Sequence, residues 1–499
     1  MVDQTTDETV KLFLRAAKID GDDKLFSIGP FGSRVSFASQ QRRALNTVWA
    51  LEQQGKIGPG KKVAVIGGGL AGVMAAVALA ARKCVVHLYE RESAVLNLQQ
   101  LTTHRHVHPS VNFWPEQPLN PTTTFPFLDW HADKCSQVID TLRQEWTQYF
   151  AGWINKIFLG TTVDKLEPAD DGIEVVASGK SAPAAPVSYS VVILAVGFGG
   201  EKVVAGIDSK SYWDLDDLAH SEGSGDHEMV SGVGDGGLID VLRIVHRNFN
   251  KGLLGLKLIE ILDESGIGPL VLDLEARILD KYMREEDAEA AAAEYAAGYA
   301  SLVEDAPPNA TALLDESIRQ DLQKPVSLIG RTAYPYVLTS APVHKFMLAH
   351  ALNRGAIEYA KGDLSDGPNL APGPLRVPCV VRHGPNNDLS GLVEAGKIKS
   401  LRQRQLVISD ILANVPYDGS YWWNWKDYPE QDFESPAFVQ FRLKNARQYV
   451  LNEYNEMLFR EDRLYYVLQQ PSRPEFSRFP SKLFGIRTEV RPQKVFAAP

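Results

Sequence analysis

A glycine-rich turn between an apolar segment and an alanine-rich segment constrains this chain more than any other feature. It lies in residues 62–72, which read Lys-Val-Ala-Val-Ile-Gly-Gly-Gly-Leu-Ala-Gly, and a second apolar segment follows and ends at Glu90. Gly67 permits a tight turn, Gly69 lets the backbone approach a pyrophosphate, and Gly72 lets the helix pack closely on the strand. This order predicts a strand–helix–strand unit that binds a dinucleotide containing ADP.

The residues next to this turn supply the rest of such a site. The expected helix, from about Leu70 to Ala81, directs the free N–H groups of Leu70 and Ala71 and the positive end of its dipole toward the phosphates. Glu90 closes the second strand, where its carboxylate can accept hydrogen bonds from a ribose diol. Arg91 follows it and is a further candidate for cofactor binding. A parallel-sheet crossover with incidental glycines is the alternative.

The size and composition of the chain limit the classes of protein that it can be. Its 499 residues exceed one compact core, so two or three domains are expected. The formal net charge is −10 with acids and bases interspersed, which predicts no nucleic-acid surface. No apolar run reaches the roughly 20 residues that span a bilayer, and the N-terminus is polar and acidic, so we expect neither a membrane segment nor a signal peptide. Cys84, Cys135 and Cys379 form no CxxC pair, which fits a reducing, cytoplasmic setting.

Breaks in the apolar pattern divide the chain into four predicted segments. They are a helical N-terminal extension (1–60), an α/β dinucleotide-binding domain (61–225), a second, smaller α/β domain (226–390) with a helical insertion (245–320), and a helical, aromatic-rich C-terminal region (391–499).

The second α/β segment begins with another strand–turn–helix pattern. Gly232, Gly234 and Gly237 repeat the glycine spacing of the first turn, and Asp235 follows the middle glycine. A buried strand precedes this pattern and breaks at Gly197.

Together these features resemble the FAD-dependent oxidoreductases that have two dinucleotide-binding domains. In that superfamily a strand ending in an Ala-Thr-Gly-like triplet closes the first part of the FAD domain, and Ala195-Val196-Gly197 stands in that place. The resemblance implies an α/β fold with an FAD-binding Rossmann-type domain and a second, smaller nucleotide-binding domain. It also implies that Gly232, Gly234 and Gly237 bind NADPH or NADH, and that the backbone of Val163 contacts the adenine.

Two departures from the family pattern leave the role of the second motif open. The family's Gly-Gly pair after the ribose acid is missing, and Leu98-Gln99-Gln100 stands there instead. The Gly234-Asp235 pair also resembles the point at which the superfamily closes its FAD site, with an aspartate on the ribitol chain. Asp235 therefore belongs either to the FAD site or to a separate nicotinamide nucleotide site. For the latter, Arg331 at the end of the next strand is a candidate for holding an NADPH 2′-phosphate.

The segment His104-Arg105-His106-Val107-His108-Pro109 is the strongest candidate for chemistry outside the glycine turns. Three imidazoles and a guanidinium are poorly suited to a core, and a solvated surface loop is the alternative. Arg105 can neutralise a pyrophosphate or stabilise an anionic reduced flavin, so we assign it to both cofactor binding and catalysis. His108 can act as an acid or base, because the ordinary pKa of histidine is about 6.5. No carboxylate or cysteine lies beside these histidines, so we expect no metal site.

Two other groups have an open role. Trp114 and the cluster of Trp422, Trp423 and Trp425 can stack on a substrate, but large aromatic residues more often fill a core or a domain interface, and we favour that role. The turn Arg382-His383-Gly384-Pro385 stands where a second triplet is expected, and it is either an active-site turn or a plain surface turn.

The resemblance implies an oxidoreductase with FAD as its cofactor. Our first hypothesis is an NAD(P)H-dependent flavoprotein monooxygenase that hydroxylates a small organic molecule, since the missing CxxC pair argues against a disulfide reductase. The second is an FAD-dependent oxidase or dehydrogenase of amines or amino acids, and the third is a non-catalytic or redox-sensing flavoprotein. We expect a small-molecule substrate, no nucleic-acid partner and no membrane partner, and we leave a homo-oligomer open.

Overall fold

The computed structural model describes most of residues 3–414. The positions within that range that it leaves out are 33, 198, 205–206, 208–209, 217, 219–228, 248, 250–251, 283–286, 323, 365–378 and 385–387. The chain divides into two compact units, Met1–Gln431 and Asp432–Pro499, and all of the described residues belong to the first. The tryptophans at positions 422, 423 and 425, and most of the predicted C-terminal region, lie outside the described residues.

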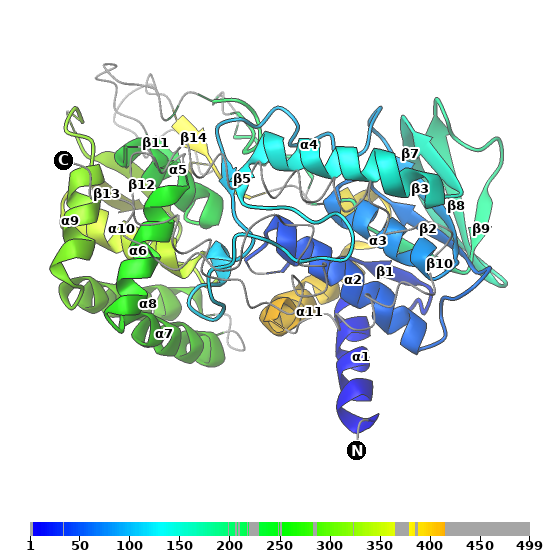
Figure 1. The fold of residues 1–499 in the computed structure, drawn as a ribbon, viewed down its shortest axis with the longest axis horizontal. Helices are drawn as coiled ribbons and strands as arrows, with labels where there is room; N and C mark the ends of the chain where they lie inside the picture. Colours follow the sequence, from blue (N-terminus) through cyan, green and yellow to red (C-terminus); the bar gives the residue numbers. More distant parts are fainter. Residues whose placement is uncertain are drawn as a thin grey trace, which may run out of the picture. The chain divides into compact units, whose positions relative to one another are not determined.

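A parallel sheet of five strands carries the first glycine turn (Figure 1). Its order is β1-β10-β2-β3-β6, and every neighbouring pair is parallel. Helix α3 connects β2 to β3 and is buried from Gly72 to Ala81, because it has no charged side chain and mostly alanine-sized ones. The elements are β1 Leu25–Ser27, β2 Lys62–Ile66, α3 Leu70–Ala81, β3 Val85–Glu90, β6 Lys156–Leu159 and β10 Val191–Leu194.

The N-terminal segment is more than the helical extension that the sequence predicts. Helices α1 (Asp3–Ala17) and α2 (Phe37–Gln53) flank strand β1, which forms the edge of the parallel sheet beside β10. With three residues, β1 is too short to show a periodic pattern, so the sequence gives no sign of it. Residues 1–60 are therefore part of the first sheet domain.

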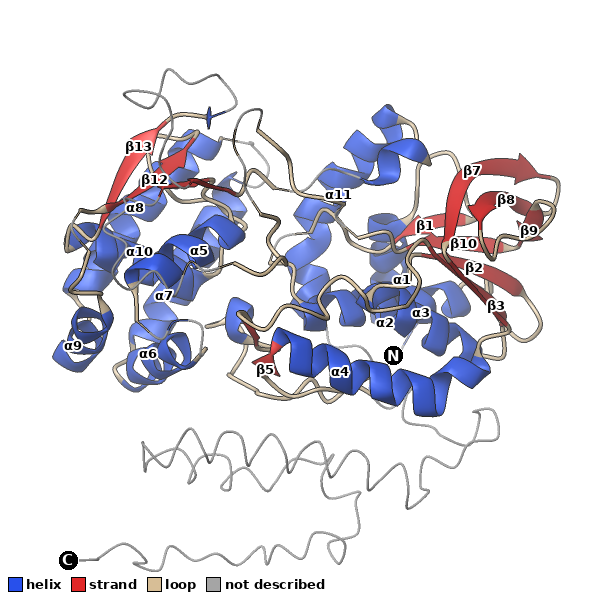
Figure 2. Cartoon of the chain, turned by 90° about the horizontal axis from the view of Figure 1, so that it is seen from above, coloured by secondary structure: helices blue, strands red, loops and turns tan. Residues whose placement is uncertain are grey.

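A second parallel sheet, of four strands in the order β13-β12-β11-β14, carries the second glycine turn. Its connections repeat those of the first sheet, because β11, β12, β13 and β14 take the places of β2, β3, β6 and β10. Figure 2 shows helices α5 and α10 beside these strands. The elements are β11 Met229–Ser231, α5 Asp235–Val245, β12 Val326–Gly330, α10 Pro342–Asn353, β13 Ile357–Lys361 and β14 Cys379–Val381.

Four helices lie between α5 and β12, within the range 245–320. They are α6 Leu253–Glu264, α7 Ile267–Tyr282, α8 Ala288–Glu304 and α9 Pro308–Ser317. Their apolar faces share one core with α5, α10 and the second sheet. Trp114 also belongs to this core: it is 1% exposed, and its Nε1 donates to Asp263 Oδ1 at 2.8 Å. Its position is that of a packing residue at the junction with the helical insertion.

The remaining elements lie around the first sheet. They are the antiparallel sheet β7 Thr161–Ala169, β8 Gly172–Gly179 and β9 Val187–Tyr189, the two-stranded β4 His106–Val107 with β5 Asp133–Lys134, helix α4 Cys135–Glu145 with the π-helical turn Trp146–Phe150, the 3-10 turns Val111–Phe113, Ala151–Trp153 and Asp388–Gly391, and helix α11 Ala395–Asn414. Among the described helices, none is long and apolar enough to cross a membrane.

Candidate functional site: two nucleotide turns on one cavity

Both glycine turns open into the same cavity, which has a volume of about 1790 Å³. A pocket for one small ligand typically measures about 300–1,000 Å³, so this cavity has room for more than one. The ends of the parallel strands line it, as expected for the ligand crevice of an α/β sheet.

The first turn has the geometry that a dinucleotide requires. Gly67 has a φ of +106°, and a Cβ there would lie 2.3 Å from the Ala195 carbonyl oxygen. A Cβ on Gly72 would lie 1.8 Å from the Gly67 carbonyl oxygen, so helix and strand approach too closely for any side chain. Gly69 precedes the first turn of α3 and has open space around its Cβ position. The residues present therefore leave the exposed backbone and the free space that the pyrophosphate of FAD needs.

Glu90 closes β3 beside this turn, where the sequence predicts the ribose acid. Its Oε2 accepts from the Gly68 N–H at 2.5 Å, and its Oε1 accepts from the Glu92 N–H at 2.7 Å. These two bonds fix the carboxylate at the cavity wall and leave lone pairs on both oxygens for a ribose diol.

The other residues predicted to contact FAD also line the cavity. They are Leu70 and Ala71 at the start of α3, Arg91 after β3, Val163 on β7, and Gly197 after β10. Gly197 has a φ of +73° and open space around its Cβ position. The structure thus brings the predicted contacts for the pyrophosphate, the ribose and the adenine to one wall, and their roles stay predictions.

The second turn repeats the geometry of the first. Gly232 has a φ of +122°, and a Cβ there would lie 2.1 Å from the Arg382 carbonyl oxygen. A Cβ on Gly237 would lie 1.9 Å from the Gly232 carbonyl oxygen, whereas Gly234 is open. The Arg382-His383-Gly384 turn therefore takes the place of Ala195-Val196-Gly197. Gly384 has a positive φ of +80°, close to the +73° of Gly197.

The two sites differ at the position of the ribose acid. The Gly67 N–H donates to the carbonyl oxygen of Tyr89, the residue before Glu90. In the second sheet, the Gly232 N–H donates to the carbonyl oxygen of Ile329, the residue before Gly330. Gly330 therefore takes the place of Glu90. A Cβ on Gly330 would lie 2.6 Å from Val233 Cγ1, because Val233 stands where the first site has Gly68. The second site therefore has no acid at this position and no room for one.

Arg331 follows Gly330 and lines the cavity, with 73% of its side chain exposed. Its Nε donates to Asp363 Oδ2, which holds the guanidinium beside the empty acid position. This is the location at which the sequence predicts a partner for an NADPH 2′-phosphate.

Asp235 is the first residue of α5, which follows strand β11 of the second sheet, whereas the first turn belongs to the other parallel sheet. Its Oδ1 accepts from His344 Nδ1 at 2.7 Å and from the Ala341 N–H at 2.9 Å. Burial raises the pKa of Asp235, but His344 and the Ala341 N–H together hold it below its usual value. The carboxylate is thus turned toward α10, which favours the second-site role of this motif over the ribitol role.

The histidine–arginine segment is buried, contrary to the prediction that it is poorly suited to a core. His104, Arg105 and His108 are each less than 10% exposed. The Arg105 guanidinium donates to Asp240 on α5 at 2.9 and 3.2 Å, and its Nε donates to the Tyr212 carbonyl oxygen at 2.6 Å. These bonds direct the Arg105 guanidinium to Asp240, although the residue also lines the cavity, and its predicted roles in cofactor binding and catalysis stay predictions. The burial of the segment excludes a solvated loop.

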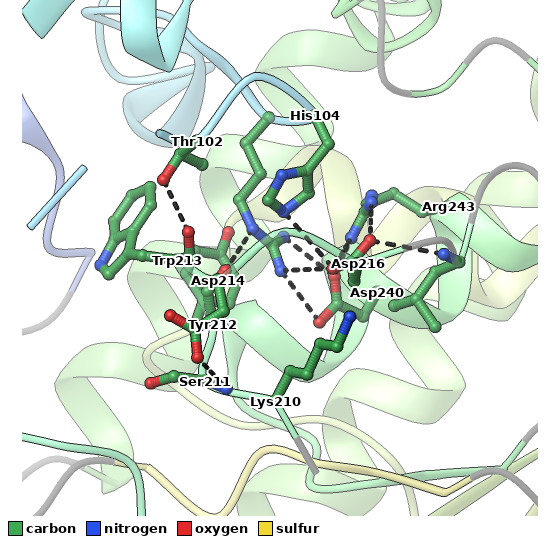
Figure 3. Close-up of polar contacts among 12 residues, drawn as sticks. Thr102, His104, Lys210, Ser211, Tyr212, Trp213, Asp214, Asp216, Asp240 and Arg243 are labelled. Carbon is green, nitrogen blue, oxygen red and sulfur yellow. Dashed lines mark hydrogen bonds and ion pairs between the residues drawn. The ribbon is translucent and has the colours of Figure 1, made fainter. Parts of the chain in front are cut away.

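Arg105 belongs to a larger buried ion cluster (Figure 3). Asp240 also accepts from Arg243 at 2.8 Å. It accepts from Arg382 at 2.8 Å as well. Asp216 accepts from Arg243 at 2.6 Å and lies 3.4 Å from His104 Nε2. Burial alone would raise the pKa of both carboxyls, but the surrounding cations hold both below their usual values.

His108 has a local structural role in addition to lining the cavity. Its Nδ1 accepts from the Ser110 and Val111 N–H groups, both at 3.2 Å. Its Nε2 therefore carries the proton of the neutral ring. His106 lies against Gly252, and loss of solvation lowers its pKa to about 4.

Ser231, His383 and Asp363 also meet at the strand ends of the second sheet. Ser231 Oγ and His383 Nε2 are 2.7 Å apart, but His383 Nδ1 is 3.8 Å from Asp363 Oδ1. The second distance is too long for a hydrogen bond, so these residues are not arranged as a hydrolase triad. Within the described residues, no group of histidine, cysteine and acid side chains has the arrangement of a metal site.

Two contacts between residues of the cavity region have no signal in the sequence. His344 meets Asp235 across 109 positions, and Asp240 meets Arg105 across 135. Asp235 stands out in the sequence beside Gly234, whereas only its location in the first turn of a helix that follows a sheet strand could have drawn attention to His344.

Comparison with known proteins gives one family match. Residues 62–120 match the model of the pyridine nucleotide-disulphide oxidoreductases. No curated protein sequence matches the chain. Among solved structures, OTEMO in complex with FAD and NADP is 11% identical over 67% of this chain and 73% of its own, with a TM-score of 0.34. The bacillithiol disulfide reductase of Staphylococcus aureus is 9% identical over 61% and 67%, with a TM-score of 0.29.

The Bacillus cereus bacillithiol disulfide reductase is 15% identical over 37% of this chain, with a TM-score of 0.25, and the chain spans 55% of its length. The match over residues 62–120, together with two turns of the same dinucleotide-binding geometry, supports an FAD-dependent oxidoreductase of the superfamily with two dinucleotide-binding domains.

Proposed function

We propose that this protein is an NADPH-dependent flavoprotein monooxygenase that hydroxylates a small organic molecule. The observation that carries the proposal is the opening of both glycine turns into one cavity, which is larger than a typical pocket for one small ligand. A hydride donor and a flavin must meet for electrons to pass between them, and a shared cavity allows this.

The first turn, Glu90 and Val163 would hold FAD, and bound FAD would supply a hydride acceptor. The protein's own contribution is orientation: Gly69 presents free backbone to the pyrophosphate, and Glu90 is fixed by two N–H groups for the ribose. The second turn would hold the pyrophosphate of the nicotinamide nucleotide in the same manner.

The second site favours NADPH over NADH. An acid at the end of the second strand selects NADH, because it accepts from the ribose diol and repels a 2′-phosphate. Gly330 stands in that place, and the exposed guanidinium of Arg331 follows it.

The cysteines argue against a thiol–disulfide reaction. Cys84, Cys135 and Cys379 are the three cysteines of the sequence, and all are free and buried. Burial raises their pKa values to about 11, 12 and 11, so none is a reactive thiolate near neutral pH. Free thiols also fit the reducing cytoplasm as the location of this protein.

An FAD-dependent oxidase or dehydrogenase is the second candidate. The observation in its favour is Asp235, whose carboxylate begins α5 at the point where a pyrophosphate would bind. A negative charge there opposes a second nucleotide, and a substrate that reduces the flavin directly needs none.

The test is an anaerobic titration of the FAD-loaded protein with NADPH and with NADH, followed by the flavin absorbance. We expect rapid bleaching at lower concentrations of NADPH. Arg331→Ala should raise the Kd of NADPH about tenfold, the size of one charge-assisted hydrogen bond, and leave that of NADH unchanged. A flavin that both nucleotides leave oxidised would refute the proposal and direct the search to amines and amino acids as reductants.

A further inference from the structure

We propose that His344 is a catalytic proton-transfer residue, oriented by Asp235, in a subsite for an apolar molecule that bears a hydroxyl group. The proposal rests on the proposed function, because it names the substrate class of the same cavity.

The orientation of His344 follows from its contacts. His344 lies in the first turn of α10, and its Nδ1 donates to Asp235 Oδ1 at 2.7 Å. The Ala341 N–H donates to the same oxygen at 2.9 Å, which fixes the carboxylate. The neutral ring therefore carries its proton on Nδ1, and Nε2 is an acceptor.

The Nε2 atom has no hydrogen-bond partner within the described part of the chain. His344 is 8% exposed and lines the cavity, so the ring is held by its surroundings while its basic nitrogen is available to a ligand. A carboxylate on one nitrogen and a free cavity on the other is the arrangement that makes imidazole a general base.

The walls around His344 are mostly apolar. Phe249 packs on the imidazole with ring centroids 6.2 Å apart, and Val343 lies beside Gly255 at the start of α6. Leu256 and Val111 line the same cavity. An apolar body with one polar group matches such a wall, because a buried imidazole needs a hydrogen-bond partner and the rest of the surface does not.

The charged groups near His344 are already paired. Lys345, the next residue, is fully buried and donates to Glu275 at 3.0 Å. Across the cavity, His106 contacts Gly252, and burial lowers its pKa to about 4, so it is neutral near pH 7. Asp235 is the charge that acts directly on His344.

The step is a proton transfer. The O–H bond of the substrate breaks, its electron pair stays on the substrate oxygen, and the proton moves to His344 Nε2. The resulting imidazolium is stabilised by the Asp235 carboxylate. No electrons leave the substrate in this step, so it needs no further reactant.

The probe is 4-fluorophenol bound to the FAD-loaded protein, with its ionisation followed by the fluorine NMR shift as the pH is varied. We expect the wild-type protein to increase the ionisation constant of the bound phenol about tenfold over the free one, a change of one pKa unit. His344→Gln should abolish this increase, and Asp235→Asn should reduce it. His350→Gln, which removes an imidazole from the same helix outside the cavity, is the matched control and should not change it.

Two results would overturn the proposal. The first is a failure of 4-fluorophenol to bind the wild-type protein, or an equal ionisation constant of the bound phenol in the wild type and in His344→Gln. The second is an unchanged phenol titration with weaker NADP⁺ binding in His344→Gln, because that would assign the pair to the nucleotide site. FAD content and NADPH reduction of the wild type are measured separately, so a failure of the proposed function is seen independently of this titration.

Discussion

The glycines of the first turn differ in why glycine is needed at each position. A Cβ on Gly67 or Gly72 would lie only 2.3 or 1.8 Å from a backbone carbonyl oxygen, so the fold itself requires glycine at both positions. Gly69 has an ordinary φ of −71° and nothing within 4 Å of its Cβ position, so the fold does not require glycine there. We therefore expect the requirement for glycine at this position to come from the cofactor, and substitution can tell the two roles apart.

Gly69→Ala should leave the stability of the apoprotein within about 0.5 kcal/mol of wild type and weaken FAD binding. Gly72→Ala should instead destabilise the apoprotein by about 1–3 kcal/mol, because its Cβ meets a backbone oxygen that cannot easily move. Thermal unfolding of the apoproteins and fluorescence titration with FAD measure the two effects. Equal FAD affinity in Gly69→Ala and wild type would contradict the assigned contact.

At the scale of elements, the ion cluster ties the segment before β4 to helix α5. Asp240 on α5 faces three guanidinium groups, those of Arg105, Arg243 and Arg382, and it is completely buried. The three arginines come from a loop, a helix and a strand end that lie far apart in the sequence. Removing the shared acid would take a carboxylate partner from all three buried guanidinium groups, and Asp216 would remain as a partner of Arg243.

Asp240→Asn should therefore lower the free energy of unfolding by about 3–5 kcal/mol. Glu167→Gln, which breaks the exposed pair with Lys165, is the control and should cost no more than about 1 kcal/mol. Urea unfolding of both variants provides the comparison. A loss in Asp240→Asn no larger than in the control would mean that the cluster is not a stabilising junction.

The distance along the chain between interacting residues determines which of these features could be predicted from the sequence. The first turn, Glu90 and the second turn were predictable, because their constraints act between residues that are close in the chain. Strand β1 was not, since three residues show no period. The burial of Arg105 was not either, because its partner Asp240 lies 135 positions away and no local pattern announces an ion pair. The predicted roles of Arg105 toward a cofactor stay predictions.

Across the whole molecule, buried histidines make the fold sensitive to acid. Burial lowers the pKa of His246 from 6.5 to about 3, and nearby His350 adds to the effect. Below pH 6.5 the unfolded chain binds a proton that the folded protein does not, so stability falls as the pH decreases toward 3. His87 and His106, both with a pKa near 4, act in the same direction.

Between pH 6.5 and pH 4.5, His246 should account for about 2–3 kcal/mol of lost stability. His246→Asn removes this titration, so its stability should fall less over the same range. Urea unfolding of wild type and variant at both pH values measures the difference. Parallel losses in the two proteins would show that His246 does not stay neutral in the fold.

The acid position of the second site has a consequence for how this protein can change over time. In the first site Gly68 leaves room for Glu90, whereas in the second Val233 fills that room and Tyr359 Oη would lie 2.8 Å from a Cβ on Gly330. In each site, one of the two facing positions, in the turn or at the end of the next strand, holds a glycine, and the other holds a larger residue. An acid introduced at Gly330 alone therefore meets a steric barrier. A variant that is to hold a ribose diol through such an acid would also need a smaller residue at Val233 and a shift of the Tyr359 side chain, so several changes would have to occur together.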